Sequence, residues 1–144
     1  MIRNIRHTGI VIKDLEESMR FYTEILGFEV KKVMDEEGPF ISTILGMKDI
    51  KVTTIKMTTP DGQMLELLHY PGEKGSQIVS KLDSIGLTHF AITVDDLEMT
   101  YSFLKETGIS FISEPQISSD GFAKVAFCTD PNNVFIEIVE ELKS

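Results

Sequence analysis

The sequence predicts an α+β fold made of two tandem βαβββ units, on three observations. Residues 5–16 and 87–98 match each other at a constant offset, which aligns His7 with His89 and the Asp-Leu-Glu that ends each segment. After each match the chain shows the same order of segments, one with helical periodicity and then three with strand character. Each unit also ends on an apolar strand that contains a single glutamate. Shared strand–helix patterning is the alternative explanation of the match. We favour a true repeat and expect residues 1–144 to form one domain, a curved, cup-like mixed sheet with helices outside.

The first unit covers about residues 5–70. Its opening strand, residues 5–12, leads to Asp14, a suitable N-cap for a helix with apolar residues at helical spacing. Gly27 is well placed to end that helix. Further strands are predicted at 28–33, 52–57 and 63–70, a loop at 35–39, and a strand or a short helix at 40–45.

The second unit covers about residues 87–140 and repeats this order. A strand at 87–94 precedes a helix that runs from Asp95 or Asp96 to Thr107. The remaining strands are predicted at 111–112, 122–128 and 134–139. Between the units, a linker is predicted at 71–76 and one or two helical turns at 78–82.

Composition restricts the functional classes. The formal charge is −9 and the pI about 4.8, whereas nucleic-acid binding needs a concentrated basic surface, so no nucleic-acid partner is expected. Cys128 is the only cysteine, which excludes an intrachain disulfide, and its apolar neighbours predict a buried core residue. No apolar segment approaches the roughly 20 residues that span a bilayer, and the N-terminus shows no apolar signal region. We therefore expect a cytoplasmic protein without membrane contacts.

Four side chains form a candidate metal site. Glu66 and Glu137 each lie in the last strand of a unit, with apolar neighbours on both sides. An ionised carboxylate buried without a partner is very costly, and His7 and His89, on strand faces of otherwise small residues, are the available partners. Singly, such a histidine or glutamate is more often structural, but their occurrence at matching places in both units favours a shared function. Two nitrogen and two oxygen donors suit a divalent cation, and the sequence therefore predicts metal ligands at His7, Glu66, His89 and Glu137.

Residues that point inward from the same strands would line a substrate pocket. The candidates are Val11, Met57, Lys124 and Phe127. An inward Lys124 would attract an anionic substrate, although a lysine at the start of a strand more often faces solvent.

These residues and their surroundings resemble the vicinal oxygen chelate superfamily. This superfamily includes glyoxalase I, methylmalonyl-CoA epimerase, extradiol dioxygenases and the fosfomycin and bleomycin resistance proteins. Besides the four ligand residues in paired βαβββ units, the similar stretches are 7–16, 21–28 and 61–67. The resemblance covers about residues 5–140 and is specific for fold and metal ligation. The order His, Glu, His, Glu is similar to that of the short bacterial glyoxalase I, whereas methylmalonyl-CoA epimerase commonly has Gln at the position of Glu66.

The resemblance implies a metal-dependent lyase, isomerase or epimerase. Such an enzyme chelates neighbouring oxygens of a small oxo-acid, oxo-aldehyde or thioester and moves a proton by way of an enolate. Glu137, or alternatively Glu66, would be both ligand and catalytic base. One divalent ion per site is implied, with Ni, Co, Zn, Mn and Fe as candidates. Residues 38–47 do not resemble the glutathione-binding region of glyoxalase I.

Two other functions remain open from the resemblance. One is an extradiol-type ring-cleaving dioxygenase, and the other is a non-catalytic protein that binds a small molecule such as an antibiotic. Members of the superfamily pair their units within one chain or between two chains. The open sheet edges favour a homodimer.

Overall fold

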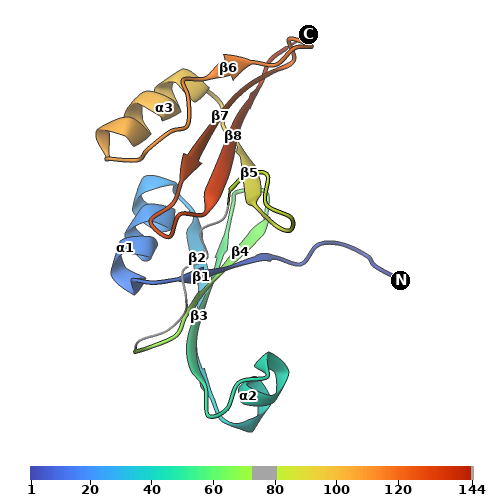
Figure 1. Cartoon of the computed structure of the whole chain (residues 1–144), viewed down its shortest axis with the longest axis vertical. Coiled ribbons are helices and arrows are strands. Elements are labelled where there is room, and N and C mark those ends of the chain that lie inside the picture. The colour runs from blue at the N-terminus through green and yellow to red at the C-terminus, as the bar shows by residue number, and fades with distance from the viewer. Residues whose placement is uncertain (73–80, 144) are drawn as a thin grey trace. The chain divides into compact units, whose positions relative to one another are not determined.

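The computed structural model describes residues 1–72 and 81–143. The chain forms two compact units, Met1–Ser76 and Gln77–Ser144, and each contains one four-stranded sheet (Figure 1). The linker and the helical turns predicted between the units fall mostly outside the described residues. The α+β class and the two tandem units are confirmed.

Unit 1 follows the predicted order with one additional helix. Its elements are strand β1 (Thr8–Ile12), helix α1 (Leu15–Met19) with its π-helical continuation η1 (Arg20–Ile25), strand β2 (Glu29–Glu37), helix α2 (Pro39–Leu45), strand β3 (Lys51–Thr58) and strand β4 (Met64–His69). The strand order is β1-β4-β3-β2. β1 and β4 are parallel, and the other pairs are antiparallel.

Unit 2 repeats this topology. Its elements are strand β5 (His89–Thr93), helix α3 (Leu97–Glu106) and strands β6 (Gln116–Ile117), β7 (Ala123–Thr129) and β8 (Phe135–Glu141). The strand order is β5-β8-β7-β6, and β5 is parallel to β8 just as β1 is parallel to β4. The first and last strands of each unit are therefore direct neighbours.

The first helix of each unit begins with the same cap. The Asp14 carboxylate accepts a hydrogen bond from the Glu17 backbone N–H at 2.8 Å. The Asp96 carboxylate accepts one from the Met99 N–H at 2.9 Å. An aspartate in extended conformation satisfies an otherwise unpaired N–H of the first helical turn, which is why both helices begin one residue later.

Two predicted elements differ in the structure, and a third, left open between strand and helix, is a helix. The 35–39 segment is not simply a loop, because β2 continues through its charged residues to Glu37, paired with β3 up to Lys51. The segment 40–45, for which strand and helix were both open, lies within α2. In unit 2, Phe111 makes only an isolated bridge with Cys128, and the strand at this edge is β6 instead.

The sheet of unit 1 has one buried face and one open face. Five apolar side chains alternate onto the buried face: Ile10, Ile55, Met57, Leu65 and Leu67. We define the open face by Gly9, Glu66 and Lys56, which are partners in register on three neighbouring strands. α2 covers one end of this open face, where Ile41 packs in a cluster that includes Leu68 (Figure 1).

In unit 2, α3 lies against β7 and β8. Ile136, Ile138 and Cys128 are fully buried, so the prediction of a core cysteine is confirmed. Burial raises the pKa of the Cys128 thiol to about 12, and the nearby charge of Asp130 acts in the same direction. Among the described residues, no helix is long and apolar enough to cross a membrane.

Candidate metal centre

Unit 1 brings one predicted histidine and one predicted glutamate together. Glu66 lies on β4 opposite Gly9, and His7 precedes β1 by one residue. Because side chains alternate along a strand, His7 and Gly9 point to the same face, and the glycine leaves room beside the carboxylate. His7 Nε2 lies 3.7 Å from Glu66 Oε1, with the two side chains 29% and 13% exposed.

Unit 2 contains the equivalent pair. Glu137 lies on β8 opposite Ala91, and His89 begins β5 two residues earlier on the same face. His89 Nε2 lies 3.2 Å from Glu137 Oε2. The residue facing the glutamate is again small, so the same packing arrangement produces both pairs.

Further contacts hold His89 in place. The Thr88 hydroxyl lies 2.9 Å from His89 Nδ1, on the ring nitrogen remote from Glu137. The Phe127 ring packs edge-on against the imidazole, with ring centroids 5.2 Å apart. His7 differs, since its Nδ1 is buried and has no hydrogen-bond partner among the residues that the structure describes.

The donor set fits a divalent metal. Two donor atoms that each lie about 2.1 Å from one metal ion are about 3 to 3.5 Å apart. The nitrogen–oxygen separations of 3.2 and 3.7 Å are close to that range. Imidazole nitrogen with carboxylate oxygen suits zinc and the neighbouring transition metals. Over residues 1–72 and 81–143, no group of three or more His, Cys, Asp or Glu side chains is placed to hold a metal, so each unit by itself offers two ligands.

Two of the predicted pocket residues lie beside these pairs. Phe127 is the register partner of Glu137 on the neighbouring strand. Val11 lies on the same face as His7 and Gly9, and the residue is 59% exposed. Both positions suit residues that contact a ligand.

The structure corrects the other two. Met57 is fully buried and pairs with Leu65, so it belongs to the core face of unit 1. Lys124 pairs with Glu140 and points to the face covered by α3, where its Nζ lies 3.6 Å from Glu98 Oε1. Neither side chain shares a face with a candidate ligand, because each is one residue out of phase with the position that does.

Lys56, and not Met57, is the β3 residue that lies next to a candidate ligand, and it supplies the inward lysine that was expected at Lys124. It is partly buried and lies opposite Glu66 on β3. The alternation of β3 alone does not reveal this, since strand register determines which residue lies opposite the glutamate. Thr88 was also missed, although its place next to His89 was a usable signal.

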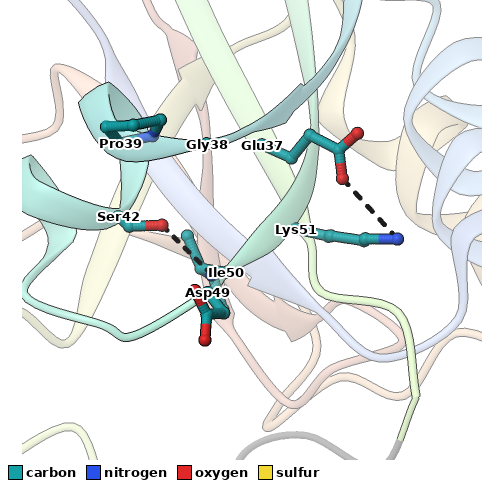
Figure 2. Close-up of a pocket in the computed structure, with 7 residues that line it drawn as sticks. All are labelled: Glu37, Gly38, Pro39, Ser42, Asp49, Ile50 and Lys51. Atoms are coloured by element: carbon teal, nitrogen blue, oxygen red, sulfur yellow. Dashed lines mark hydrogen bonds and ion pairs between the residues drawn. The ribbon is translucent and has the colours of Figure 1, made fainter.

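A separate pocket of about 450 Å³ lies where β2, α2 and β3 meet (Figure 2). Glu37 and Lys51 form an ion pair of 3.6 Å at its wall, and the Ser42 hydroxyl accepts a hydrogen bond from the Ile50 N–H. None of the seven lining residues is one of the candidate ligands. The pocket is therefore distinct from the His7–Glu66 pair.

Comparison with known proteins identifies the family. The model of the Glyoxalase/Bleomycin resistance protein/Dioxygenase superfamily matches residues 4–138. The chain belongs to this superfamily. The resemblance inferred from the ligand residues and the paired units is thereby confirmed.

Three members of the superfamily illustrate the similarity. Lactoylglutathione lyase of Schizosaccharomyces pombe is 28% identical over 95% of this chain, which spans 47% of that protein, or about half its length. The uncharacterized protein YurT of Bacillus subtilis is 32% identical over 93% of this chain and 96% of its own length. A crystal structure of a glyoxalase family protein from Bacillus cereus has a TM-score of 0.88 at 20% identity, covering 99% of this chain and 97% of that one. This last likeness shows the shared fold.

Proposed function

We propose that this superfamily member is a divalent-metal-dependent lyase or isomerase of the glyoxalase type. Its substrate would be a small oxo-acid, oxo-aldehyde or thioester, in which a proton moves at the carbon beside a carbonyl. The observation that carries the proposal is the presence in each unit of a histidine and a glutamate at the same place, within 3.7 and 3.2 Å of each other. A lactoylglutathione lyase among the relatives supports this reaction type.

His7, Glu66, His89 and Glu137 would ligate the metal, which supplies Lewis acidity toward a carbonyl oxygen. The carboxylates have a second role. A carboxylate that stands beside the bound substrate is within reach of the proton on the adjacent carbon and can act as general base. Glu137 is our candidate for the base, with Glu66 as the alternative. Phe127 and Val11 would exclude water from the reacting carbon, since both present apolar surface beside a His–Glu pair.

Two substitutions test the proposal. Purified protein is reconstituted with Ni²⁺, Co²⁺, Zn²⁺ and Mn²⁺, and Glu66→Gln and Glu137→Gln are compared with the wild type for metal content and turnover. The substrates are 2-oxo aldehydes with and without glutathione, acyl-CoA thioesters and catechols. We expect each variant to bind metal at least tenfold more weakly and to lose most turnover. A matched control is Glu141→Gln, an exposed carboxylate on the same strand as Glu137.

Four results would contradict the proposal. Wild-type protein that binds no divalent metal is one, and full turnover in both variants is another. Oxygen consumption with catechols would identify a ring-cleaving dioxygenase instead. Tight ligand binding without turnover would identify a binding protein.

A further inference from the structure

One row of residues crosses the whole open face of unit 1. Gly9 on β1 is the register partner of Glu66 on β4, and Glu66 is the partner of Lys56 on β3. Lys56 is in turn the partner of Lys32 on the edge strand β2. Directly paired residues point to the same face, so the carboxylate and the two lysines share it, and Lys32 directly follows a register shift of the β2–β3 ladder between Val30 and Lys32. Neighbouring strands are about 4.8 Å apart, which places the lysine positions about 5 and about 10 Å from that of Glu66.

The two lysines have no ion-pair partner in the part of the chain that the structure describes. Other lysines nearby do: Lys31 pairs with Glu29 at 2.9 Å, and Lys51 pairs with Glu37 at 3.6 Å. Even with Glu66 opposite it, the Lys56 ammonium forms no ion pair within 4.0 Å of that carboxylate. Like charges that face each other across a sheet are destabilising. The pairing of Lys32 with Lys56 is therefore a cost to the fold.

The row is not required by the repeated topology. In unit 2 the partner of Glu137 is Phe127, an aromatic residue, where unit 1 has Lys56. The two candidate half-sites thus share a histidine and a glutamate but differ in the next residue of the row. The whole chain has a net charge of −9, whereas the two adjacent unpaired lysines give this ligand-bearing face a local positive charge.

We propose that Lys56 and Lys32 bind an oxyanion of the substrate, either a carboxylate or a phosphate. This oxyanion would lie about 5 to 10 Å from the substrate atoms that bind next to Glu66. The proposal rests on the proposed function, since it concerns the same ligand. A bound oxyanion neutralises the repulsion between the lysines, so anion binding explains why the like-charge pair is tolerated. The substrate would then combine a chelating oxo group with an anionic extension directed toward β2.

A matched pair of ligands tests this. 2-Oxoglutarate and 2-oxopentanoate have the same five-carbon chain and the same 2-oxo acid head, and only the first has a distal carboxylate. 2-Oxo-4-phosphonobutanoate provides the phosphate arm. Binding to the metal-loaded, full-length protein is measured by titration calorimetry for the wild type, Lys56→Met, Lys56→Arg and Lys32→Met. The metal affinity and Tm of each variant are measured in parallel.

We expect the wild type to bind at least one ligand with a distal oxyanion at least tenfold more tightly than 2-oxopentanoate. Lys56→Met should abolish most of that preference by weakening the ligands with a distal oxyanion far more than 2-oxopentanoate, whereas Lys56→Arg should restore it. Lys32→Met should reduce it less, because the residue lies farther from Glu66. Both methionine variants should raise Tm by relieving the repulsion. Lys51→Met, also on β3 but paired with Glu37, is the control and should retain the preference.

Two outcomes distinguish a failure of the oxyanion-binding proposal from a failure of the proposed function. If the wild type binds no metal, the proposed function itself is wrong. If metal binds normally but Lys56→Met keeps the full preference, or the wild type shows none, the lysine pair has no role in ligand binding and the proposed function stands. The relative affinities of the carboxylate and phosphonate ligands decide which oxyanion the site takes.

Discussion

The two histidines of the candidate centre are held differently. A neutral imidazole has one N–H and one lone pair, and the partner of one nitrogen determines which of them the other presents. At His89, the Thr88 hydroxyl lies within hydrogen-bond distance of Nδ1; when Nδ1 carries the proton and donates it to this hydroxyl, Nε2, the atom that faces Glu137, presents its lone pair. At His7, Nδ1 has no such partner within the described ranges. Thr88 is thus a positioning residue for one half of the site.

We expect Thr88→Val to weaken metal binding about tenfold, because outer hydrogen-bond partners of metal ligands typically contribute 10–100-fold in affinity. Thr88→Ser keeps the hydroxyl and should bind metal like the wild type. The measurement is a competition titration against a chelator, with the tautomer of His89 followed by its ¹⁵N chemical shifts. Equal affinities in the valine and serine variants would show that the hydroxyl does not position the ring.

At the scale of single elements, α3 shows how a strand supports a helix in unit 2. The Glu140 carboxylate on β8 accepts a hydrogen bond from the backbone N–H of Leu97, at 2.8 Å. Asp96 already satisfies the N–H of Met99, so two acidic groups serve the first turn. A negative charge at a helix N-terminus is also favourable toward the helix dipole. Leu97 is fully buried, and the contact therefore fixes the helix start against the sheet.

Glu140→Ala should lower the free energy of unfolding by about 1 kcal/mol, the usual effect of losing a cap. Glu140→Gln keeps an acceptor oxygen and should cost less. The adjacent, exposed Glu141→Ala is the control, expected to remain within about 0.5 kcal/mol of the wild type. Urea denaturation followed by circular dichroism measures all three. A Glu140→Ala variant as stable as the control would show that Asp96 alone caps the helix.

The turn between β3 and β4 contains a carboxylate that accepts local hydrogen bonds. Asp61 accepts hydrogen bonds from the Thr59 hydroxyl and the Gln63 N–H, and these bonds lower the pKa of its carboxyl. A carboxyl with a lowered folded pKa stabilises the fold above its unfolded pKa. That contribution is lost as the pH falls through the folded pKa.

We expect Thr59→Ala to raise the pKa of Asp61 toward its ordinary value, because the largest cause of the shift is removed. The part of the stability that Asp61 contributes at neutral pH and loses on acidification should then be smaller than in the wild type, because the folded and unfolded pKa values lie closer together. Carboxyl chemical shifts in an NMR titration report the pKa directly, and Asp120, which has a similar bond from Ser118, serves as internal reference. An unchanged Asp61 titration in the variant would contradict this explanation.

At the scale of the whole molecule, metal binding and folding stability are linked. A metal that binds only the folded chain stabilises it by about 2.7 kcal/mol at a concentration 100 times its Kd. If ligands from both units are needed, removing either pair should abolish the effect. The Tm in the presence of metal therefore tests whether the two units act together.

We expect saturating divalent metal to raise the Tm of the wild type by several degrees. His7→Ala and His89→Ala should each show little or no shift, although one lies in unit 1 and the other in unit 2. Differential scanning calorimetry with and without chelator gives the measurement. A full shift in one of the two variants would show that a single His–Glu pair is enough to bind the metal.

Much of this architecture was predictable because its signals are local. The repeat, the caps at Asp14 and Asp96 and the alternation around Glu66 and Glu137 are all properties of neighbouring residues. The pairing of each predicted glutamate with its histidine followed from the parallel contact between the first and last strand of a unit. Lys124 and Met57 were misplaced because each lies one step out of phase, and a shift of one residue moves a side chain to the other face.

The sequence by itself determined the class of fold, the two units and the four candidate ligands, since strand and helix periodicity and cap residues act over a few positions. Only the tertiary structure decided which residues lie opposite the glutamates. Lys56 and Phe127 became neighbours of the candidate ligands through the register between strands, which depends on pairing between residues distant in the chain. The same register aligned Lys32 with Lys56 and so defined the row from which an anionic substrate is inferred.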